Sequence, residues 1–244
     1  MRLRLTLEYD GTAFRGWAAQ PGLRTVEGEL RRALGNLYGS VDSLAVAGRT
    51  DAGVHALGQV ASVDVDDGPP PGRVAEALNT ALPDDVTVVA AEEAAPDFHA
   101  RHSACSRAYR YRIFRRRTPS PFEARRSWWI PQPPDVAALE RAAGLLVGEH
   151  DFRAFTPTET HHEIFRRQVL AARWVERDDY LDFEIEADSF LRHMVRTLVG
   201  TMVDLERERL PALLEGADRS AAGRTAPPWG LYLERVTYPD ASGV

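Results

Sequence analysis

A nine-residue stretch, GRTDAGVHA (48–56), gathers side chains that could do chemistry into one short segment. It places the carboxylate of Asp51 close to the guanidinium of Arg49, with glycines on both sides. Glycine permits tight and left-handed turns, so such a segment can project a carboxylate from a loop. A carboxylate can stabilise an oxocarbenium-like sugar carbon or bond to it covalently. Taken alone, the segment is also compatible with an ordinary turn stabilised by the Asp51 side chain.

The charge of the chain is concentrated in one region. The 244 residues carry a net charge of −6, yet residues 99–126 hold nine arginines against a single acid, Glu123. A basic segment on an acidic body favours the binding of phosphate groups, because steering depends on the local potential. The alternative is that these arginines form a solvated strand and loop without a ligand.

The composition is typical of a soluble globular protein, with 44% hydrophobic and 27% charged residues. No apolar run approaches the roughly 20 residues of a membrane helix. The first ten residues alternate apolar and polar side chains, so we expect no signal peptide and predict a cytoplasmic protein. The lone Cys105 excludes an internal disulfide. Four histidines, His99, His102, His161 and His162, have no supporting cysteines, and we predict no metal site.

Hydrophobic periodicity predicts strands interleaved with amphipathic helices. We expect an opening strand with Leu3, Leu5 and Leu7 on one face, and further strands over residues 44–47, 58–65, 86–90, 106–114, 180–187 and within 227–239. We expect helices over residues 26–37, 73–82, 135–148 and 190–207, with Thr25, Asp135 and Ser189 as N-caps. This order predicts an α+β fold of two similar halves, each with helices packed on an antiparallel sheet. The halves would be residues 1–104 and 105–244, with a substrate cleft between them.

The segment 48–56, which contains Asp51, also resembles part of a known protein family. GRTDAGVHA resembles the catalytic motif of the tRNA pseudouridine synthase A family. Eight further stretches resemble that family in the same order: EYDGTAFRGW (8–17), TVEGELRRAL (25–34), ALNTALPDDV (77–86), DFHARHSA (97–104), AYRYRI (108–113), HDFRAF (150–155), FLRHMVRTLVGTM (190–202) and GLYL (230–233). Chance does not produce nine collinear matches.

The resemblance implies the pseudouridine synthase fold and an isomerase that acts on tRNA. Its substrate would be uridine at positions 38, 39 and 40 of the anticodon stem-loop, and the enzyme would be a homodimer. The reaction is redox-neutral, so no cofactor is expected. Asp51 matches the family's essential aspartate, and the sequence leaves open whether it attacks C1′ or removes a sugar proton.

The resemblance also assigns four substrate-binding residues. Tyr109 would stack on the target base, and Arg196 would keep Asp51 ionised, with Arg192 on nearly the same face of a helix. Arg49 would contact RNA and help to hold the base out of its stack. Leu231 would line the pocket, although burial in a sheet explains it equally well. The strand register makes Tyr111 a core residue.

Two other function classes fit parts of the sequence. A non-catalytic RNA-binding module of the same fold would be expected to lose Asp51, Tyr109 or Arg196, and all three are present. A small glycosidase needs two carboxylates about 5–10 Å apart, and the loop offers one. The chain departs from the family at Ala18, where glutamine is usual, and over residues 158–168. Both departures are expected to affect RNA contacts.

Overall fold

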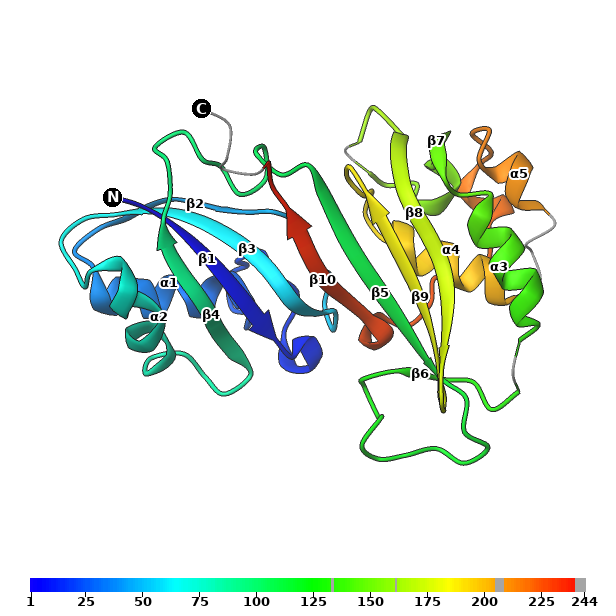
Figure 1. Cartoon of the computed structure of the whole chain (residues 1–244), viewed down its shortest axis with the longest axis horizontal. Coiled ribbons are helices and arrows are strands. Elements are labelled where there is room, and N and C mark those ends of the chain that lie inside the picture. The colour runs from blue at the N-terminus through cyan, green and yellow to red at the C-terminus, as the bar shows by residue number, and fades with distance from the viewer. Residues whose placement is uncertain (133, 161, 205–208, 240–244) are drawn as a thin grey trace. The chain divides into compact units, whose positions relative to one another are not determined.

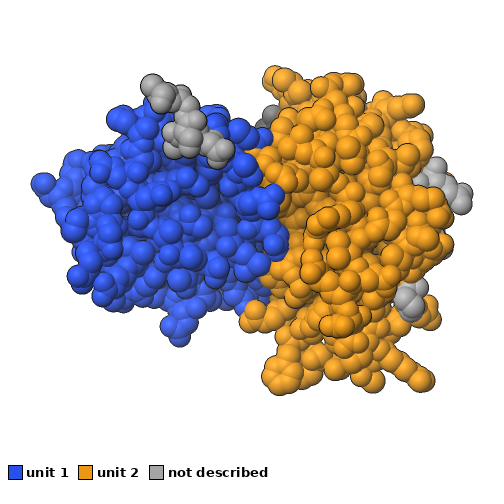
Figure 2. Space-filling view, viewed as in Figure 1, with its two compact units in different colours: residues 1–105, 233–244 blue, residues 106–232 orange. Residues whose placement is uncertain are grey.

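The computed structural model describes residues 1–132, 134–160, 162–204 and 209–239. It divides the chain into two compact units, coloured separately in Figure 2. Unit 1 is Met1–Cys105 together with the described residues from Leu233 onward, and unit 2 is Ser106–Tyr232. The final strand, which we expected in the second half, thus counts with the first unit from Leu233. Compactness alone does not show independent folding, so the two-domain division at residue 104 stays a prediction.

Unit 1 is built on an antiparallel sheet. Its elements are β1 (Arg2–Tyr9), the 3-10 helix η1 (Gly11–Ala13), α1 (Val26–Leu37), β2 (Val41–Val46), β3 (His55–Val65), α2 (Pro71–Asn79), β4 (Val86–Glu93) and most of β10 (Leu231–Thr237). The strand order is β4-β1-β3-β10, and β2 also pairs with β3. In Figure 1 both α1 and α2 cover one face of this sheet.

The alternation of β1 decides which face of the sheet is covered. Leu3, Leu5 and Leu7 are fully buried, and the residues between them are at least partly exposed. Helix α1 begins where predicted, because the Thr25 hydroxyl accepts a hydrogen bond from the Gly28 N–H at 3.2 Å. Its buried face includes Leu30 and Leu34. The sequence pattern therefore predicted the framework of unit 1 correctly.

Unit 2 repeats this plan with its own strands and helices. Its elements are β5 (Ser106–Phe114), β6 (Trp128–Trp129), α3 (Val136–Gly144), β7 (Gly148–Asp151), η2 (Arg153–Phe155), β8 (Arg166–Arg177), β9 (Tyr180–Ala187), α4 (Met194–Val203), α5 (Leu210–Leu213), η4 (Arg219–Ala221) and η5 (Pro228–Gly230). The order β5-β9-β8-β7 is antiparallel throughout, and β6 runs parallel to β5. The α+β prediction with two similar sheet-plus-helix halves is confirmed.

Two predicted helices of unit 2 were wrong in detail, and one strand was missed. Helix α4 begins at Met194 and not after Ser189, because His193 adopts a left-handed conformation with φ of 62°. The predicted end of that helix at 207 lies outside the described residues. Helix α3 ends at Gly144, and Gly148 instead starts β7 with φ of +115°. Strand β8 was not predicted.

Among the described residues, no helix is both long and apolar enough to cross a lipid bilayer.

Candidate active site

The segment that holds Asp51 connects β2 to β3 and is tied to the chain around Trp17. The Trp17 N–H donates to the Thr50 carbonyl oxygen at 3.0 Å, and the Gly53 N–H donates to the Phe14 carbonyl oxygen at 3.3 Å. A turn is closed by the Val54 N–H, which donates to the Asp51 carbonyl oxygen at 3.1 Å. The backbone on both sides of Asp51 is therefore held by the 14–17 segment.

Two glycines allow this close approach of backbone to backbone. At Gly16, which has φ of +95°, an added Cβ would lie 2.9 Å from the Thr50 carbonyl oxygen. At Gly11, an added Cβ would lie 2.0 Å from the Val54 carbonyl oxygen. Real Cβ atoms do not approach oxygen this closely, so each site requires glycine. These two residues belong to the 8–17 stretch, and the structure explains why that stretch accompanies the Asp51 segment.

A buried polar network lies under the segment. The hydroxyls of Tyr9 and Thr50 are 2.8 Å apart, and the Gln59 Nε2 donates to the Gly48 carbonyl oxygen at 2.7 Å and to the Tyr9 oxygen at 3.2 Å. Burial raises the pKa of Tyr9 to about 12, although the hydrogen bonds with Thr50 and Gln59 oppose the shift. Tyr9 is thus neutral near pH 7. Sequence reasoning missed this network, although Gln59 within an apolar run was a signal for it.

His55 is a buried, hydrogen-bonded residue of the segment. It is 2% exposed, and its Nδ1 accepts a hydrogen bond from the Gly11 N–H at 3.0 Å. A ring nitrogen that accepts from an N–H carries no proton of its own. The 3.2 Å approach of Nδ1 to the Asp10 carboxylate is therefore not an ion pair.

The two charged side chains of the segment differ in exposure. Arg49 is exposed and Asp51 is half-buried, whereas Thr50 between them is 7% exposed and Val54 is buried. The segment therefore presents Asp51 on a backbone that its buried neighbours hold in place. This is the arrangement that a positioned carboxylate requires.

Tyr109 lies on β5 in unit 2, opposite Ile185 of β9. It is 8% exposed, and its ring meets that of Phe190 edge-on, with centroids 4.9 Å apart at 79°. Phe190 is half-buried and restricts how the Tyr109 ring can turn. Tyr111, two residues along, is fully buried and donates to the Pro227 carbonyl oxygen at 2.8 Å, so its assignment to the core is supported.

Arg196 lies in the first turn of α4 and is bound to the segment before β10. Its Nε donates to the Ala226 carbonyl oxygen at 2.9 Å, and the Ala226 N–H donates to the Arg196 carbonyl oxygen at 3.0 Å. The side chain is half-buried, whereas most of the helix is buried. Arg192 lies in a turn before the helix and is exposed, so our placement of it on the same helix face as Arg196 was wrong.

The 222–226 segment that binds Arg196 packs tightly on α4. A Cβ added at Gly200 would lie 1.9 Å from the Arg224 carbonyl oxygen. The hydroxyls of Thr197 and Thr225 are 3.2 Å apart, and the Thr201 hydroxyl accepts from the Gly223 N–H at 3.0 Å. Sequence reasoning missed these contacts, although two threonines four residues apart in an apolar helix were a signal for a polar partner.

Leu231 is 6% exposed at the start of β10 and Leu233 is fully buried. Burial of Leu231 is expected whether it lines a pocket or packs in the sheet. By position, Asp51 and Arg49 belong to unit 1, whereas Tyr109, Arg196 and Leu231 belong to unit 2.

Three arginines of the basic segment 99–126 pair with acids on neighbouring strands. Arg110 and Arg112 lie 3.5 and 3.1 Å from the fully buried carboxylate of Asp182 on β9. Arg115 lies 2.7 Å from the Glu176 carboxylate on β8. Acids of neighbouring strands therefore pair with three of its nine arginines, and phosphate binding by the rest of the segment stays a prediction.

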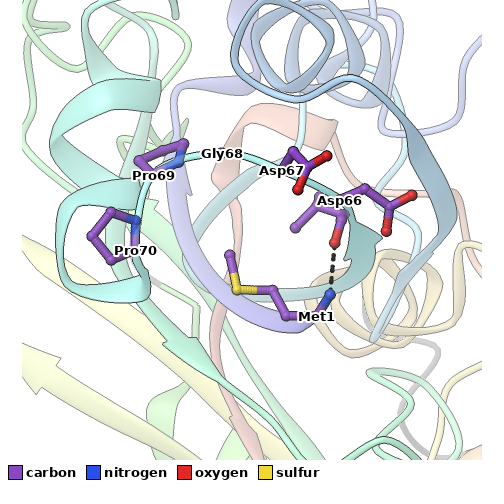
Figure 3. Close-up of a pocket in the computed structure, with 7 residues that line it drawn as sticks. Met1, Asp66, Asp67, Gly68, Pro69 and Pro70 are labelled. Atoms are coloured by element: carbon purple, nitrogen blue, oxygen red, sulfur yellow. Dashed lines mark hydrogen bonds between the residues drawn. The ribbon is translucent and has the colours of Figure 1, made fainter.

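A pocket of about 600 Å³ lies elsewhere in unit 1 (Figure 3). It is lined by Met1, Val65, Asp66, Asp67, Gly68, Pro69 and Pro70. Val65 ends β3, whereas Asp51 precedes its start at His55, and a strand of that length spans roughly 30 Å. The pocket is therefore separate from the Asp51 segment. No group of three or more potential metal ligands occurs within the described ranges, and His161 lies outside them.

Comparison with known proteins decides the family. A family model described as tRNA pseudouridine synthase matches residues 6–103 and 142–239, most of the chain. The chain belongs to the tRNA pseudouridine synthase family. Family membership makes it an enzyme of the isomerase class.

Several curated relatives in this family match along nearly their whole length. The tRNA pseudouridine synthase A of Moorella thermoacetica is 46% identical over 97% of this chain and 99% of its own. The enzyme of that name from Thermus thermophilus is also 46% identical, over 98% of this chain and 97% of its own. That of Bacillus subtilis is 41% identical over 98% of this chain and 99% of its own. The resemblance to the tRNA pseudouridine synthase A family is confirmed.

Proposed function

We propose that this member of the tRNA pseudouridine synthase family isomerises uridine at positions 38, 39 and 40 of the tRNA anticodon stem-loop, with Asp51 as the catalytic nucleophile. Conversion of uridine to pseudouridine in tRNA follows from the family and its curated relatives. The observation that carries the role of Asp51 is the backbone on both sides of it, which Phe14 and Trp17 hold by hydrogen bonds.

The chemistry suits a single positioned carboxylate. The N1–C1′ bond of uridine breaks and a C5–C1′ bond forms, while a proton leaves C5 and N1 takes one up. No electrons are gained or lost, so a redox cofactor has no part in the proposed reaction. The Asp51 carboxylate would bond to C1′ when the glycosidic bond breaks and leave it when C5 attacks. A rigid backbone reduces the entropy lost on reaching that geometry.

The four substrate-binding residues have roles that suit their surroundings. Tyr109 would stack on the uracil ring, in an orientation limited by Phe190. Arg196 would stabilise the ionised Asp51 carboxylate, because its guanidinium is held at Ala226. Arg49 is exposed, as a residue that contacts RNA must be. Leu231 would be apolar lining for the base.

Two further properties belong to this proposal. We expect a homodimer, and we expect it to act in the cytoplasm. The homodimer rests on the resemblance described above, and the cytoplasmic location rests on the composition of the chain and its single cysteine. A non-catalytic RNA-binding module of this fold is the second candidate function, and what favours the enzyme over it is the presence of Asp51, Tyr109 and Arg196 together.

Chemical mapping of pseudouridine tests the proposal. Purified protein is incubated with unmodified tRNA transcripts that carry uridine at only one of positions 38, 39 and 40, and a fourth transcript has none. Pseudouridine in the first three transcripts and none in the fourth is the expected result. Binding without any product would favour the RNA-binding module. Product in the fourth transcript would show that the assigned positions are wrong.

A further inference from the structure

The loop between β5 and β6, residues 115–127, carries an exposed aromatic side chain. Phe122 is 83% exposed, more than any other large apolar side chain in the described part of the chain. A phenylalanine ring left in water forgoes the favourable free energy of apolar burial. A partner that covers the ring would recover this, so the loop is a candidate binding surface.

Hydrogen bonds fix the backbone around Phe122. The Glu123 N–H donates to the Ser120 carbonyl oxygen at 3.1 Å, and the Arg126 N–H donates to the Glu123 carbonyl oxygen at 3.0 Å. The loop is also attached to neighbouring strands. The Tyr180 hydroxyl donates to the Glu123 carboxylate at 2.8 Å, and the Tyr232 hydroxyl donates to the Arg126 carbonyl oxygen at 2.6 Å.

Prolines at 119 and 121 restrict the backbone on the N-terminal side of Phe122. The loop that carries the exposed ring is therefore ordered before a partner binds. Binding then loses little conformational entropy.

The charges of the loop indicate the chemistry of that partner. The loop contains five arginines, 115, 116, 117, 125 and 126, against Glu123, for a net charge of +4. All of them except Arg115, which pairs with Glu176, are exposed. An aromatic ring among exposed guanidinium groups matches an unpaired nucleotide, because the base stacks on the ring and phosphates bind the cations.

A second copy of this chain fits the loop less well. Stable subunit interfaces bury about 800 Å² per partner, and their centres are depleted of charged residues. Phe122 is a single ring bordered by arginines, not the centre of an apolar patch.

The Phe122 ring is also distinct from the proposed base contact at Tyr109. Tyr109 lies five residues before Phe114, where β5 ends, which is roughly 17 Å along the strand. The loop that carries Phe122 starts only beyond that end.

We propose that Phe122 stacks on an unpaired base of the tRNA other than the target uridine, with the exposed arginines of the loop on the flanking phosphates. This inference rests on the proposed function, since tRNA is the RNA in question. It adds to the enzyme a contact that reads the shape of the RNA beyond the reacting nucleotide.

Equilibrium binding of unmodified tRNA at several salt concentrations tests the stacking. Phe122→Leu keeps an apolar side chain but removes the ring face, and it should weaken binding roughly tenfold. Phe122→Tyr should bind within about twofold of wild type. Neither variant should change the salt dependence, whereas Arg117→Gln should lower its slope by about one. Leu170→Ala, at a half-exposed apolar position on β8, is the control and should bind like wild type.

Photo-crosslinking identifies what touches the ring. Phe122→p-benzoylphenylalanine should crosslink to labelled tRNA, whereas Val89→p-benzoylphenylalanine, on β4 of unit 1, should not. Crosslinking of position 122 to a second chain, or to neither partner, would overturn the inference. So would equal affinities of Phe122→Leu and wild type when wild type makes pseudouridine. If wild type binds tRNA but makes no pseudouridine, the enzymatic proposal is refuted. The affinities of Phe122→Leu and wild type then still decide whether Phe122 stacks on a base. A wild type that binds no tRNA would overturn both.

Discussion

Arg196 and Ala226 are joined twice, once through the arginine side chain and once through the backbone. The Nε donates to the Ala226 carbonyl oxygen at 2.9 Å, and the Arg196 carbonyl oxygen accepts from the Ala226 N–H at 3.0 Å. The guanidinium therefore has a defined position before any substrate is bound. Preorganised charge of this kind needs no rearrangement during the reaction.

Replacing Arg196 by lysine should lower turnover about a hundredfold, although the charge is kept. A lysine lacks the Nε donor that binds Ala226, and its ammonium is not held in the same orientation. The measurement is the single-turnover rate of pseudouridine formation at saturating tRNA. Arg192→Lys is the matched control and should react within about twofold of wild type. Equal rates for both variants would show that the hydrogen bond from Arg196 to Ala226 has no influence on turnover.

Asp51→Asn should abolish pseudouridine formation and leave tRNA binding within a few-fold of wild type. Asparagine keeps the size of the side chain and its hydrogen bonding but cannot act as a nucleophile. Product is quantified by chemical mapping over long incubations, and binding is measured separately. Turnover above roughly a thousandth of wild type would assign the chemistry to another residue. Asp42→Asn, at an exposed position on β2, should be fully active.

Gly16→Ala should impair both folding stability and turnover more than Gly22→Ala does. Both glycines have positive φ, at +95° and +73°, so both substitutions strain the backbone by about 1 kcal/mol. Only at Gly16 would the new Cβ meet another group, the Thr50 carbonyl oxygen at 2.9 Å. The difference between the two variants in urea midpoint and in rate measures the contact with the Asp51 segment. Identical effects would mean that this contact has no influence.

Stability should fall at alkaline pH because buried tyrosines resist ionisation. Burial raises the pKa of Tyr9 and of Tyr232 to about 12, against about 10 in the unfolded chain. Their contribution is fully present below pH 10 and is lost as the pH rises from 10 to 12. For each of these two tyrosines, the free energy of unfolding should fall by about 1.4 kcal/mol per pH unit between pH 10 and 12.

Denaturant midpoints measured at pH 9, 10 and 11 check the pH prediction. Tyr9→Phe removes one titrating group, so its midpoint should fall less steeply above pH 10 than that of wild type. The variant should be less stable at pH 8, because Thr50 and Gln59 lose a buried partner. Parallel curves for the two proteins would contradict the assignment to Tyr9.

Local signals in the sequence were sufficient for many elements. The hydroxyl of Thr25 and the carboxylate of Asp135 cap helices where we predicted, because a cap acts within three residues of itself. The failures came from contacts distant in sequence. Nothing near Ser189 shows that Asp188 accepts from the Gln168 N–H on β8, or that His193 turns left-handed before the helix.

The candidate site shows the same limit. Motif resemblance made Asp51 and Arg196 candidate site residues, but it did not indicate the groups that hold them. The Tyr9–Gln59 contact joins residues 50 positions apart, and the Arg196–Ala226 contact joins residues 30 apart. The ion pairs of the arginine-rich segment were not predicted, because its partners Glu176 and Asp182 lie on strands far along the chain, one of which was not predicted.

The return of β10 to unit 1 has a consequence for how the protein is made. A Cβ added at Gly58 on β3 would lie 2.5 Å from the Glu234 carbonyl oxygen, and the Cys105 N–H donates to the Thr237 carbonyl oxygen at 2.8 Å. At a synthesis rate of about 5–20 residues per second, the first 105 residues wait on the order of 10 s for this last strand while unit 2 is translated. Until then the part of the β3 edge that pairs with β10 lacks its partner, because β2 pairs only with the end of β3 from Ala61 to Val65. An unpaired edge is where a nascent chain is most prone to pair with a neighbour. Ribosomes that stall or terminate within unit 2 would therefore release chains with an incomplete first sheet, a hazard that a protein with two consecutive, self-contained halves does not face.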